Sequence, residues 1–369
     1  MPDGSSSPAP AVSVVVPTFN RPLLLRRALE SLAGQTFGDF EVVVVNDAGL
    51  DPSPVLAGFA GRLRLLLETH PANRGLAAAR NTGISSATGR YLALLDDDDL
   101  YLPEHLATLV ARAEALGGRT PVYSQGWQVL EDANGRPLSR QVLPAPPAFD
   151  EQLIRVTNFI PVLCLLLPAA QVRQAGGFDE TLEVLEDWEL WIRLAAGRPF
   201  VHLPAPTCEY RLRGGAGNST TREAFRFQQC LERVYAKHPV PKRSRLAELR
   251  RQMLEGSAAR AEAYAYDYSV LVASHGRVDR LVGCLESVVE VLAGRSYEVV
   301  LHAPATPAVL ALAGQLEGDV TVLLGQADDE AAWSVCARKA AGRAVVRLRE
   351  DEVLTADRLP VAAVPGVPA

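Results

Sequence analysis

Two short apolar runs near the start of the chain place the strongest constraint on its fold. Residues 12–16 and 42–45 consist almost entirely of valine, without the polar alternation that would leave one face of a strand in water. Such strands are typical of a parallel sheet that helices cover on both faces. Leucine and alanine recur at helical spacing from Leu24 to Leu32, directly after Pro22, which predicts a helix that begins at the proline. The chain is therefore expected to begin with an α/β domain.

Polar residues follow these strands at the point where each strand ends. Thr18 and Asn20 come after the first strand, and Asp47 follows the second. A further apolar run, residues 91–95, leads directly into four consecutive aspartates, residues 96–99. In open α/β sheets, ligands bind beyond the carboxyl ends of the strands. These side chains are therefore expected to converge on one edge of one sheet.

The aspartate run is the strongest sign of chemistry in the chain. Like charges packed together repel one another unless a cation or hydrogen-bond donors neutralise them. Mg²⁺ or Mn²⁺ carrying a substrate diphosphate suits a short acidic turn, because such sites use one or two protein carboxylates plus phosphate oxygens. Taken alone, such a run is usually a solvated acidic loop, here ahead of a helix near Pro103.

Two other segments carry candidate chemistry. Residues 73–83 predict a helix of small residues that packs closely on the sheet and offers Arg80 to a phosphate, although an arginine alone more often forms a surface ion pair. Asp187 lies at the predicted start of another helix, where the dipole orients a carboxylate, and simple N-capping explains the same pattern. Trp188 and Trp191, three residues apart, are either core or a platform for a sugar ring.

In this order, five segments resemble the family 2 glycosyltransferases, whose nucleotide-sugar-binding domain has the GT-A fold. They read Val-Val-Val-Pro-Thr-Phe-Asn-Arg, Val-Val-Asn-Asp-Ala-Gly, Asn-Arg-Gly-Leu-Ala-Ala-Ala-Arg-Asn-Thr-Gly, Gly-Arg-Tyr-Leu-Ala-Leu-Leu-Asp-Asp-Asp-Asp and Leu-Glu-Asp-Trp-Glu-Leu-Trp. The resemblance covers residues 11–240 and implies a Rossmann-like mixed, mostly parallel sheet flanked by helices.

The resemblance also implies roles for residues at the predicted sheet edge. Asp98 would hold Mn²⁺ or Mg²⁺, and Asp187 would take the proton of an acceptor hydroxyl. Four aspartates in a row allow two registers of an Asp-x-Asp motif, so the sequence leaves open which aspartate takes which role. Residues expected to bind the nucleotide or its diphosphate are Pro17, Thr18, Asn20, Arg21, Asp47, Arg80, Asp96, Asp97 and Arg213. Among them, Asp47 would accept a hydrogen bond from the base, and Arg80 would approach either the diphosphate or the acidic turn.

Arg213 departs from the family pattern. It stands where the Tyr-Arg-x-His stretch of the family has histidine, so it is expected to pair with the diphosphate directly. The glycines that follow, at residues 214, 215 and 217, indicate either a lid over the donor or a plain surface loop.

The function that the resemblance implies is transfer of a sugar, with inversion, from a nucleotide diphosphate sugar such as a UDP-sugar. The acceptor would be a glycan, a lipid-linked or a small-molecule hydroxyl, in polysaccharide or glycoconjugate biosynthesis. A sugar nucleotidyltransferase would need a glycine-rich, basic phosphate loop after the first strand, which residues 17–22 lack. A noncatalytic glycan- or nucleotide-binding scaffold is the alternative from another class.

The composition of the chain limits its expected partners and cellular location. A net charge of -6 argues against nonspecific nucleic-acid binding, and five cysteines without close pairs favour a reducing cytosol. Residues 1–10 predict a disordered tail, and the longest apolar stretch, residues 161–170, is too short to span a membrane. A cytoplasmic protein is expected. Peripheral contact with the inner face of the membrane is left open by basic residues after the catalytic segment, namely Arg222, Arg226, Arg233, Lys237, Lys242, Arg243, Arg245, Arg250 and Arg251.

The last third of the chain repeats the order of the first domain in a shorter form. Residues 268–277 follow residues 12–21, residues 297–300 follow 40–43, and residues 341–348 follow 88–95. The aspartate run becomes Arg-Glu-Asp-Glu, and the copy ends before any counterpart of Asp187. Chance similarity of two valine-rich openings is the alternative. The expected domains are a tail (1–10), a GT-A catalytic domain (11–240), a helical linker (241–265) and a truncated, degenerate, catalytically silent GT-A-like domain (266–369), through which oligomers are conceivable.

Overall fold

The computed structural model divides into two compact units. It describes residues 9–132, 135–146, 148–196, 198–213, 220–264, 266–293, 295–313, 316, 320–337, 340 and 342–359. Unit 1 comprises residues 1–214 and 234–250, and unit 2 comprises residues 215–233 and 251–369. Helix α7 (Thr220–Lys237) and helix α8 (Arg245–Tyr264) each contribute to both. None of the described helices has the length and apolar content that a membrane-spanning segment requires.

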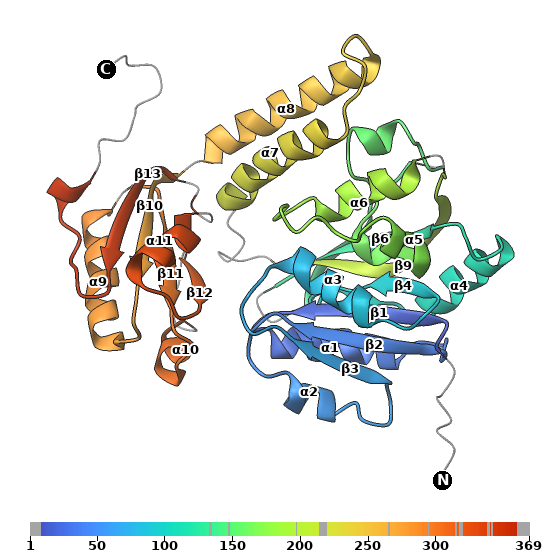
Figure 1. Ribbon diagram of the computed structural model, residues 1–369, viewed down its shortest axis with the longest axis horizontal. Coiled ribbons are helices and arrows are strands. Elements are labelled where there is room, and N and C mark those ends of the chain that lie inside the picture. Colours follow the sequence, from blue (N-terminus) through green and yellow to red (C-terminus); the bar gives the residue numbers. More distant parts are fainter. Residues whose placement is uncertain are drawn as a thin grey trace. The chain divides into compact units, whose positions relative to one another are not determined.

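A sheet that has nine strands in the described residues forms the centre of unit 1 (Figure 1). Its parallel half has the order β3-β2-β1-β4. Every valine of residues 12–16 and 42–45 is fully buried, which confirms the prediction of strands covered on both faces. The bounds are β1 (Val12–Thr18), β2 (Phe40–Asn46), β3 (Leu65–Thr69) and β4 (Tyr91–Leu94).

Helices cover both faces of this parallel half. Helix α1 begins at Pro22, as predicted, and with α4 it packs on the face that carries Val14 and Val16. Helix α3 packs on the opposite face, where any Cβ at Gly83 would clash with Val15. The close approach predicted for residues 73–83 is therefore found. The bounds are α1 (Pro22–Ala33), α2 (Ser53–Ala57), α3 (Leu76–Ser86) and α4 (His105–Ala115).

The other half of the sheet is mixed and continues as β8-β6-β9-β5, with β7 paired to β6. Strand β8 runs antiparallel to β4, so the parallel order ends there. The strands are β5 (Leu100–Tyr101), β6 (Val122–Glu131), β7 (Pro137–Val142), β8 (Leu165–Pro168) and β9 (Val201–Arg213). The helices are η1 (Leu153–Arg155), η2 (Val162–Cys164), α5 (Ala169–Gln174) and α6 (Glu186–Ala195).

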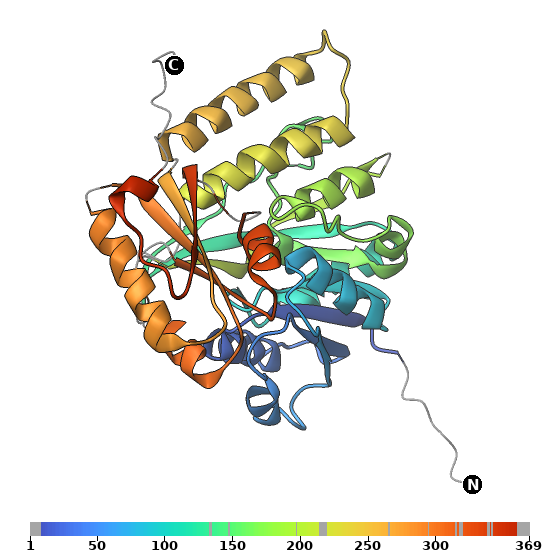
Figure 2. The ribbon, with the colours of Figure 1, turned by 60° about the vertical axis from the view of Figure 1, so that its left-hand side comes forward.

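Unit 2 contains a smaller, wholly parallel sheet with the order β12-β11-β10-β13. Helix α9 packs on the face that carries Val270 and Val272, and α11 packs on the face of Leu271 (Figure 2). The bounds are β10 (Tyr266–Ala273), α9 (Val278–Val291), β11 (Tyr297–Ala303), α10 (Pro307–Ala313), β12 (Val320–Leu324), α11 (Asp329–Ala337), β13 (Gly342–Arg349) and η3 (Ala356–Arg358).

Candidate active site

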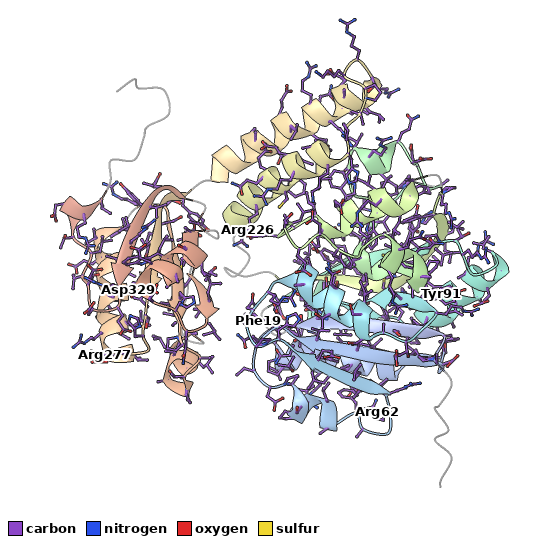
Figure 3. The ribbon with its side chains drawn as sticks, in the orientation of Figure 1. Phe19, Arg62, Tyr91, Arg226, Arg277 and Asp329 are labelled. Atoms are coloured by element: carbon purple, nitrogen blue, oxygen red, sulfur yellow. The ribbon has the colours of Figure 1, made fainter. Side chains whose placement is uncertain are left out.

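The carboxyl ends of β1, β2 and β4 lie at one edge of the unit 1 sheet. In Figure 3, Phe19 marks the end of β1 and Tyr91 marks the opposite edge, where β4 begins. The parallel pairing of β1 with both neighbours brings the residues after each strand together. The predicted convergence of the polar strand ends on one sheet edge is therefore found.

The four aspartates after β4 form a turn in which buried and accessible side chains alternate. The Asp99 N–H donates to the Asp96 carbonyl oxygen at 3.1 Å and closes the turn. Asp97 and Asp99 are 4% and 2% exposed, whereas the side chains of Asp96 and Asp98 are 26% and 30% exposed. Of the two registers open to an Asp-x-Asp motif, the turn presents the one formed by Asp96 and Asp98.

The buried aspartates of the turn are bound from β1 and β9. Thr18 Oγ1 donates to Asp97 Oδ2 at 2.7 Å, and the Arg211 backbone N–H donates to Asp99 Oδ1 at 2.8 Å. Arg21 Nη1 donates to Asp97 Oδ1 at 3.2 Å and to Asp98 Oδ2 at 2.9 Å. These bonds make the aspartate run part of the sheet edge rather than a freely solvated loop.

The electrostatics of the turn fit a bound cation. Burial raises the pKa of Asp97 to about 6, against the opposing effect of Arg21, and burial with neighbouring carboxylates raises the pKa of Asp99 well above its usual range. The turn is thus short of positive charge, which a divalent ion at the accessible oxygens would supply. Within the described residues, no three His, Cys, Asp or Glu side chains could hold a metal ion together. A cation at Asp98 would need further oxygens from a ligand or water.

Arg80 connects this turn to the start of α6. Its side chain, 2% exposed, donates from Nη2 to both oxygens of Asp96, at 2.7 and 2.9 Å, and from Nη1 to Glu186. Burial raises the pKa of Glu186 to about 7, against the opposing charge of Arg80. The sequence predicted that Arg80 meets the acidic turn or a diphosphate. The link to Glu186 was missed, although the Glu-Asp pair was the available signal.

Asp187 is the second residue of α6 and lies two residues after Leu185, whose backbone is left-handed (φ 64°). Its Oδ1 accepts from the Trp188 N–H at 2.6 Å, and its Oδ2 accepts from Asn158 Nδ2 at 3.1 Å. Burial raises the pKa of Asp187, and the Arg80 charge opposes that rise. Trp188 and Trp191 are 1% and 0% exposed, so both are core residues and the sugar-platform interpretation is wrong for the structure described.

Asp47 is engaged with the loop before α3. Its Oδ1 accepts from the Arg74 N–H at 2.8 Å and lies 2.7 Å from His70 Nδ1, and its Oδ2 accepts from the Gly75 N–H at 2.8 Å. The carboxylate therefore holds the loop in place. Its predicted contact with a nucleotide base stays a prediction.

Backbone strain gathers at this sheet edge. In the described part of the chain, the non-glycine residues with positive φ are Asn20, Ala48 and Leu185. They follow β1, follow β2 and precede α6, and such strain often marks functional sites. Asn20 Oδ1 accepts from the Leu50 N–H at 2.8 Å and joins the first two of these loops.

Two of the residues predicted to bind the donor, Pro17 and Arg213, lie toward the ends of strands. Pro17 is buried near the end of β1. Arg213 ends β9, but its side chain and the glycines at residues 214, 215 and 217 lie outside the described part. Among the basic residues after the catalytic segment, Arg250 is buried and donates to the His238 carbonyl, and Lys237 pairs with Asp179.

Comparisons with known proteins agree with this geometry. Residues 13–161 match the profile of the family described as glycosyl transferase family 2. An uncharacterized glycosyltransferase of Bacillus subtilis, YwdF, is 28% identical over 62% of this chain and 84% of its own length. The succinoglycan biosynthesis protein ExoO of Rhizobium meliloti is 32% identical over 56% of this chain and 62% of its own length.

The shares covered differ among the relatives. The matched segment is about half of this chain but less than a third of the length of two Rickettsia proteins named uncharacterized glycosyltransferase. Among solved structures, the mannosyltransferase PcManGT of Pyrobaculum calidifontis, in complex with GDP-Man and Mn²⁺, has a TM-score of 0.52 at 22% identity. That match covers 70% of this chain and 75% of the mannosyltransferase, and it confirms the predicted GT-A fold.

Proposed function

From the match of residues 13–161 to glycosyl transferase family 2, we propose that the chain is a member of this family and transfers a sugar from a nucleotide diphosphate sugar to an acceptor hydroxyl, with inversion. The observation that carries the proposal is the connection of two carboxylate sites through Arg80. Asp96 on the acidic turn and Glu186, next to Asp187, both accept from this buried guanidinium.

The donor would lie against the ends of β1, β2 and β4. We assign contacts with the nucleotide and its diphosphate to Pro17, Thr18, Asn20, Arg21, Asp47, Arg80, Asp96, Asp97 and Arg213. When bound at Asp98, Mn²⁺ or Mg²⁺ would neutralise the charge that develops on the departing diphosphate. Arg21, which is half-exposed and lies 2.9 Å from Asp98, would add positive charge next to this position.

Asp187 would act as the general base. It accepts the proton of the acceptor hydroxyl as that oxygen forms its bond to the anomeric carbon, on the face opposite the diphosphate. The bond from the anomeric carbon to the diphosphate breaks with its electron pair, so the configuration inverts. Burial favours this role, because a raised pKa makes the Asp187 carboxylate a stronger base than an exposed one.

The pathway, the donor, the acceptor and the cellular location are also proposals. Similarity to ExoO supports a product that enters polysaccharide biosynthesis. We propose a UDP-sugar donor, a cytoplasmic location and an acceptor that is a glycan, a lipid-linked or a small-molecule hydroxyl. The net charge of -6 is unfavourable for a nucleic-acid partner.

We further propose that unit 2 is a degenerate copy of the parallel half of unit 1. Its strand order, β12-β11-β10-β13, parallels β3-β2-β1-β4. Tyr268 pairs with Tyr297 and Ala344, and its aligned residue Val12 pairs with Phe40 and Tyr91, the positions that the sequence alignment equates.

Buried polar contacts support the same alignment. Ser13 Oγ donates to Glu41 at 2.7 Å, and the aligned Ser269 Oγ donates to Glu298 at 2.5 Å. Likewise, Thr18 donates to Asp97 at 2.7 Å, and Ser274 donates to Glu350 at 2.6 Å. Coincidence of two valine-rich openings would not be expected to reproduce these pairs.

Glu350 explains why unit 2 would be silent. Its carboxylate also accepts from the N–H groups of His275, at 3.0 Å, and Arg277, at 3.1 Å, in the loop that follows β10. Glutamate is one methylene longer than the aligned Asp97 and thus reaches the backbone. The chain's own carboxylate then occupies donors that would otherwise be available to a phosphate.

Calorimetry tests the donor site. UDP, GDP, dTDP and CDP are titrated with and without Mn²⁺ into wild type, Asp98→Ala and the control Asp351→Ala; GDP is included because PcManGT was solved with GDP-Man. Asp351 occupies the aligned position in unit 2 and is 50% exposed. We expect metal-dependent binding of one nucleotide that is lost only in Asp98→Ala. Absence of binding to any nucleotide by the folded protein would favour the noncatalytic scaffold.

A further inference from the structure

Asn158 lies beside the proposed base and has no role in the reaction as described so far. Its Nδ2 donates to Asp187 Oδ2 at 3.1 Å, and its Oδ1 accepts from the Ile160 N–H at 3.0 Å. Because Ile160 supplies an N–H, the oxygen of the amide must face it. The NH₂ group therefore faces Asp187, and the orientation of the amide follows from its partners.

The segment that carries Asn158 is held rigidly in unit 1. Trp188 Nε1 donates to the Ile154 carbonyl at 2.5 Å and Trp191 Nε1 to the Ile160 carbonyl at 3.2 Å, so α6 holds both ends of the segment. Two more donors reach carbonyls within it: Tyr235 Oη bonds Val156 at 2.6 Å, and Arg250 Nε bonds Arg155 at 2.8 Å. The two indoles belong to α6, which also carries Asp187 in its first turn, so Asn158 and the carboxylate are held by the same helix.

The charged groups and hydrogen-bond donors around Asp187 indicate what the Asn158 amide does. Arg80 on α3 supplies the positive charge, whereas Glu186 on α6 and Asp96 on the acidic turn are negative. Among the described residues, Arg80 donates to Asp96 and Glu186 but not to Asp187. In the part of the chain that the structure describes, the donors to the Asp187 carboxylate are the Trp188 N–H on Oδ1 and Asn158 on Oδ2. One donor on each oxygen fixes the plane of the carboxylate and leaves further lone pairs for an acceptor hydroxyl.

We propose that Asn158 is a positioning residue that orients the Asp187 carboxylate for proton transfer from the acceptor. The proposal rests on the proposed function, since it needs Asp187 to be the base. This positioning role differs from a structural role in what a substitution would change. Loss of the Asn158 donor changes the ionisation and orientation of the Asp187 carboxylate while the segment that carries Asn158 stays in place.

Asn158→Asp separates these roles. An aspartate keeps an oxygen for the Ile160 N–H but replaces the donor to Asp187 with a second carboxylate oxygen. Asn158→Ala, which adds no charge, is the second variant should the aspartate disturb folding. Gln171→Glu is the matched control, because Gln171 Nε2 donates to the Arg119 carbonyl at an exposed position on α5. Asp187→Asn tests the base itself.

The assay follows nucleotide release from UDP-glucose, UDP-N-acetylglucosamine and GDP-mannose with Mn²⁺, between pH 5.5 and 9, together with binding of UDP and GDP and thermal unfolding. For Asn158→Asp we expect kcat to fall roughly 10- to 100-fold, the range for loss of a hydrogen bond to a charged group. The acidic limb of the kcat profile should move to higher pH, because the protonated form of Asp187 is favoured. Nucleotide binding should match that of Gln171→Glu. The unfolding temperature should fall less at pH 5.5 than at pH 9, because a raised pKa of Asp187 in the folded state costs more stability as this carboxyl ionises.

Contrary results have distinct meanings. Wild-type kcat and an unmoved acidic limb in Asn158→Asp, with Asp187→Asn inactive, would overturn the role of Asn158 and leave the base in place. A fall in kcat with an unmoved limb and a lower unfolding temperature would show a structural role and overturn the proposal too. Full activity in Asp187→Asn, or no turnover of any of the three donors by wild type, would overturn the proposed function and the role of Asn158 with it.

Discussion

Replacement of Arg80 by methionine probes the link between the two carboxylate sites. Methionine has a similar length and no charge, so it would leave Asp96, Glu186 and the nearby Asp187 without their buried cation. Removing one partner from a buried ion pair costs about 3–5 kcal/mol, because the remaining charge is left without compensation. A typical domain has a free energy of unfolding of about 5–15 kcal/mol, so the loss would be a large share of the total.

The effect should depend on pH in a known direction. In the wild type, burial raises the pKa of Glu186 from 4.5 to about 7. A carboxyl whose folded-state pKa exceeds its unfolded value favours folding when protonated, and that contribution is lost as pH rises through this window. Without Arg80 the carboxyl pKa values rise further, so the window extends upward. The difference in unfolding free energy between wild type and Arg80→Met should therefore be larger at pH 8 than at pH 5.5.

Urea denaturation followed by tryptophan fluorescence measures this difference. Trp127, Trp188 and Trp191 lie in unit 1, so the signal reports mainly on the unit that contains Arg80. Arg62→Met is the matched control (Figure 3), because Arg62 pairs with Glu30 at 2.9 Å while both side chains are about half exposed. Such a surface pair contributes about 1 kcal/mol or less. A loss for Arg80→Met no greater than that of the control, or one that is equal at both pH values, would refute the reasoning.

Two further substitutions test the interior of the protein, one in each unit. Gly83→Ala should lower the unfolding free energy of unit 1 by about 1–3 kcal/mol, because the added Cβ would clash with Val15. Gly256→Ala on α8 is the control, since a Cβ there meets nothing within 4 Å and the substitution should be neutral or stabilising. Thermal unfolding of the two variants measures the difference. Glu298→Ala removes the carboxylate to which the buried Ser269 hydroxyl donates and should destabilise unit 2 by about 1–3 kcal/mol while metal-dependent nucleotide binding persists. Loss of that binding in calorimetry would contradict a silent unit 2.

Much of the fold follows from local patterns in the sequence. The valine runs at residues 12–16 and 42–45 predicted buried parallel strands, because a strand without polar alternation needs cover on both faces. The helix starting at Pro22 and the close packing around Gly83 were also predictable, since a proline and a small residue restrict the backbone locally. The parallel strand order then brought Thr18, Asp47 and the aspartate run to one edge.

Contacts between residues far apart in the chain were decided only by the tertiary structure. The sequence allowed two registers for residues 96–99, and burial by β1 and β9 selected Asp96 and Asp98 as the accessible pair. Arg80 and Glu186 are 106 residues apart, and Asn158 is 29 residues from Asp187. No periodicity or motif joins such pairs, because their contact depends on how α3, α6 and the segment before β8 pack against one sheet.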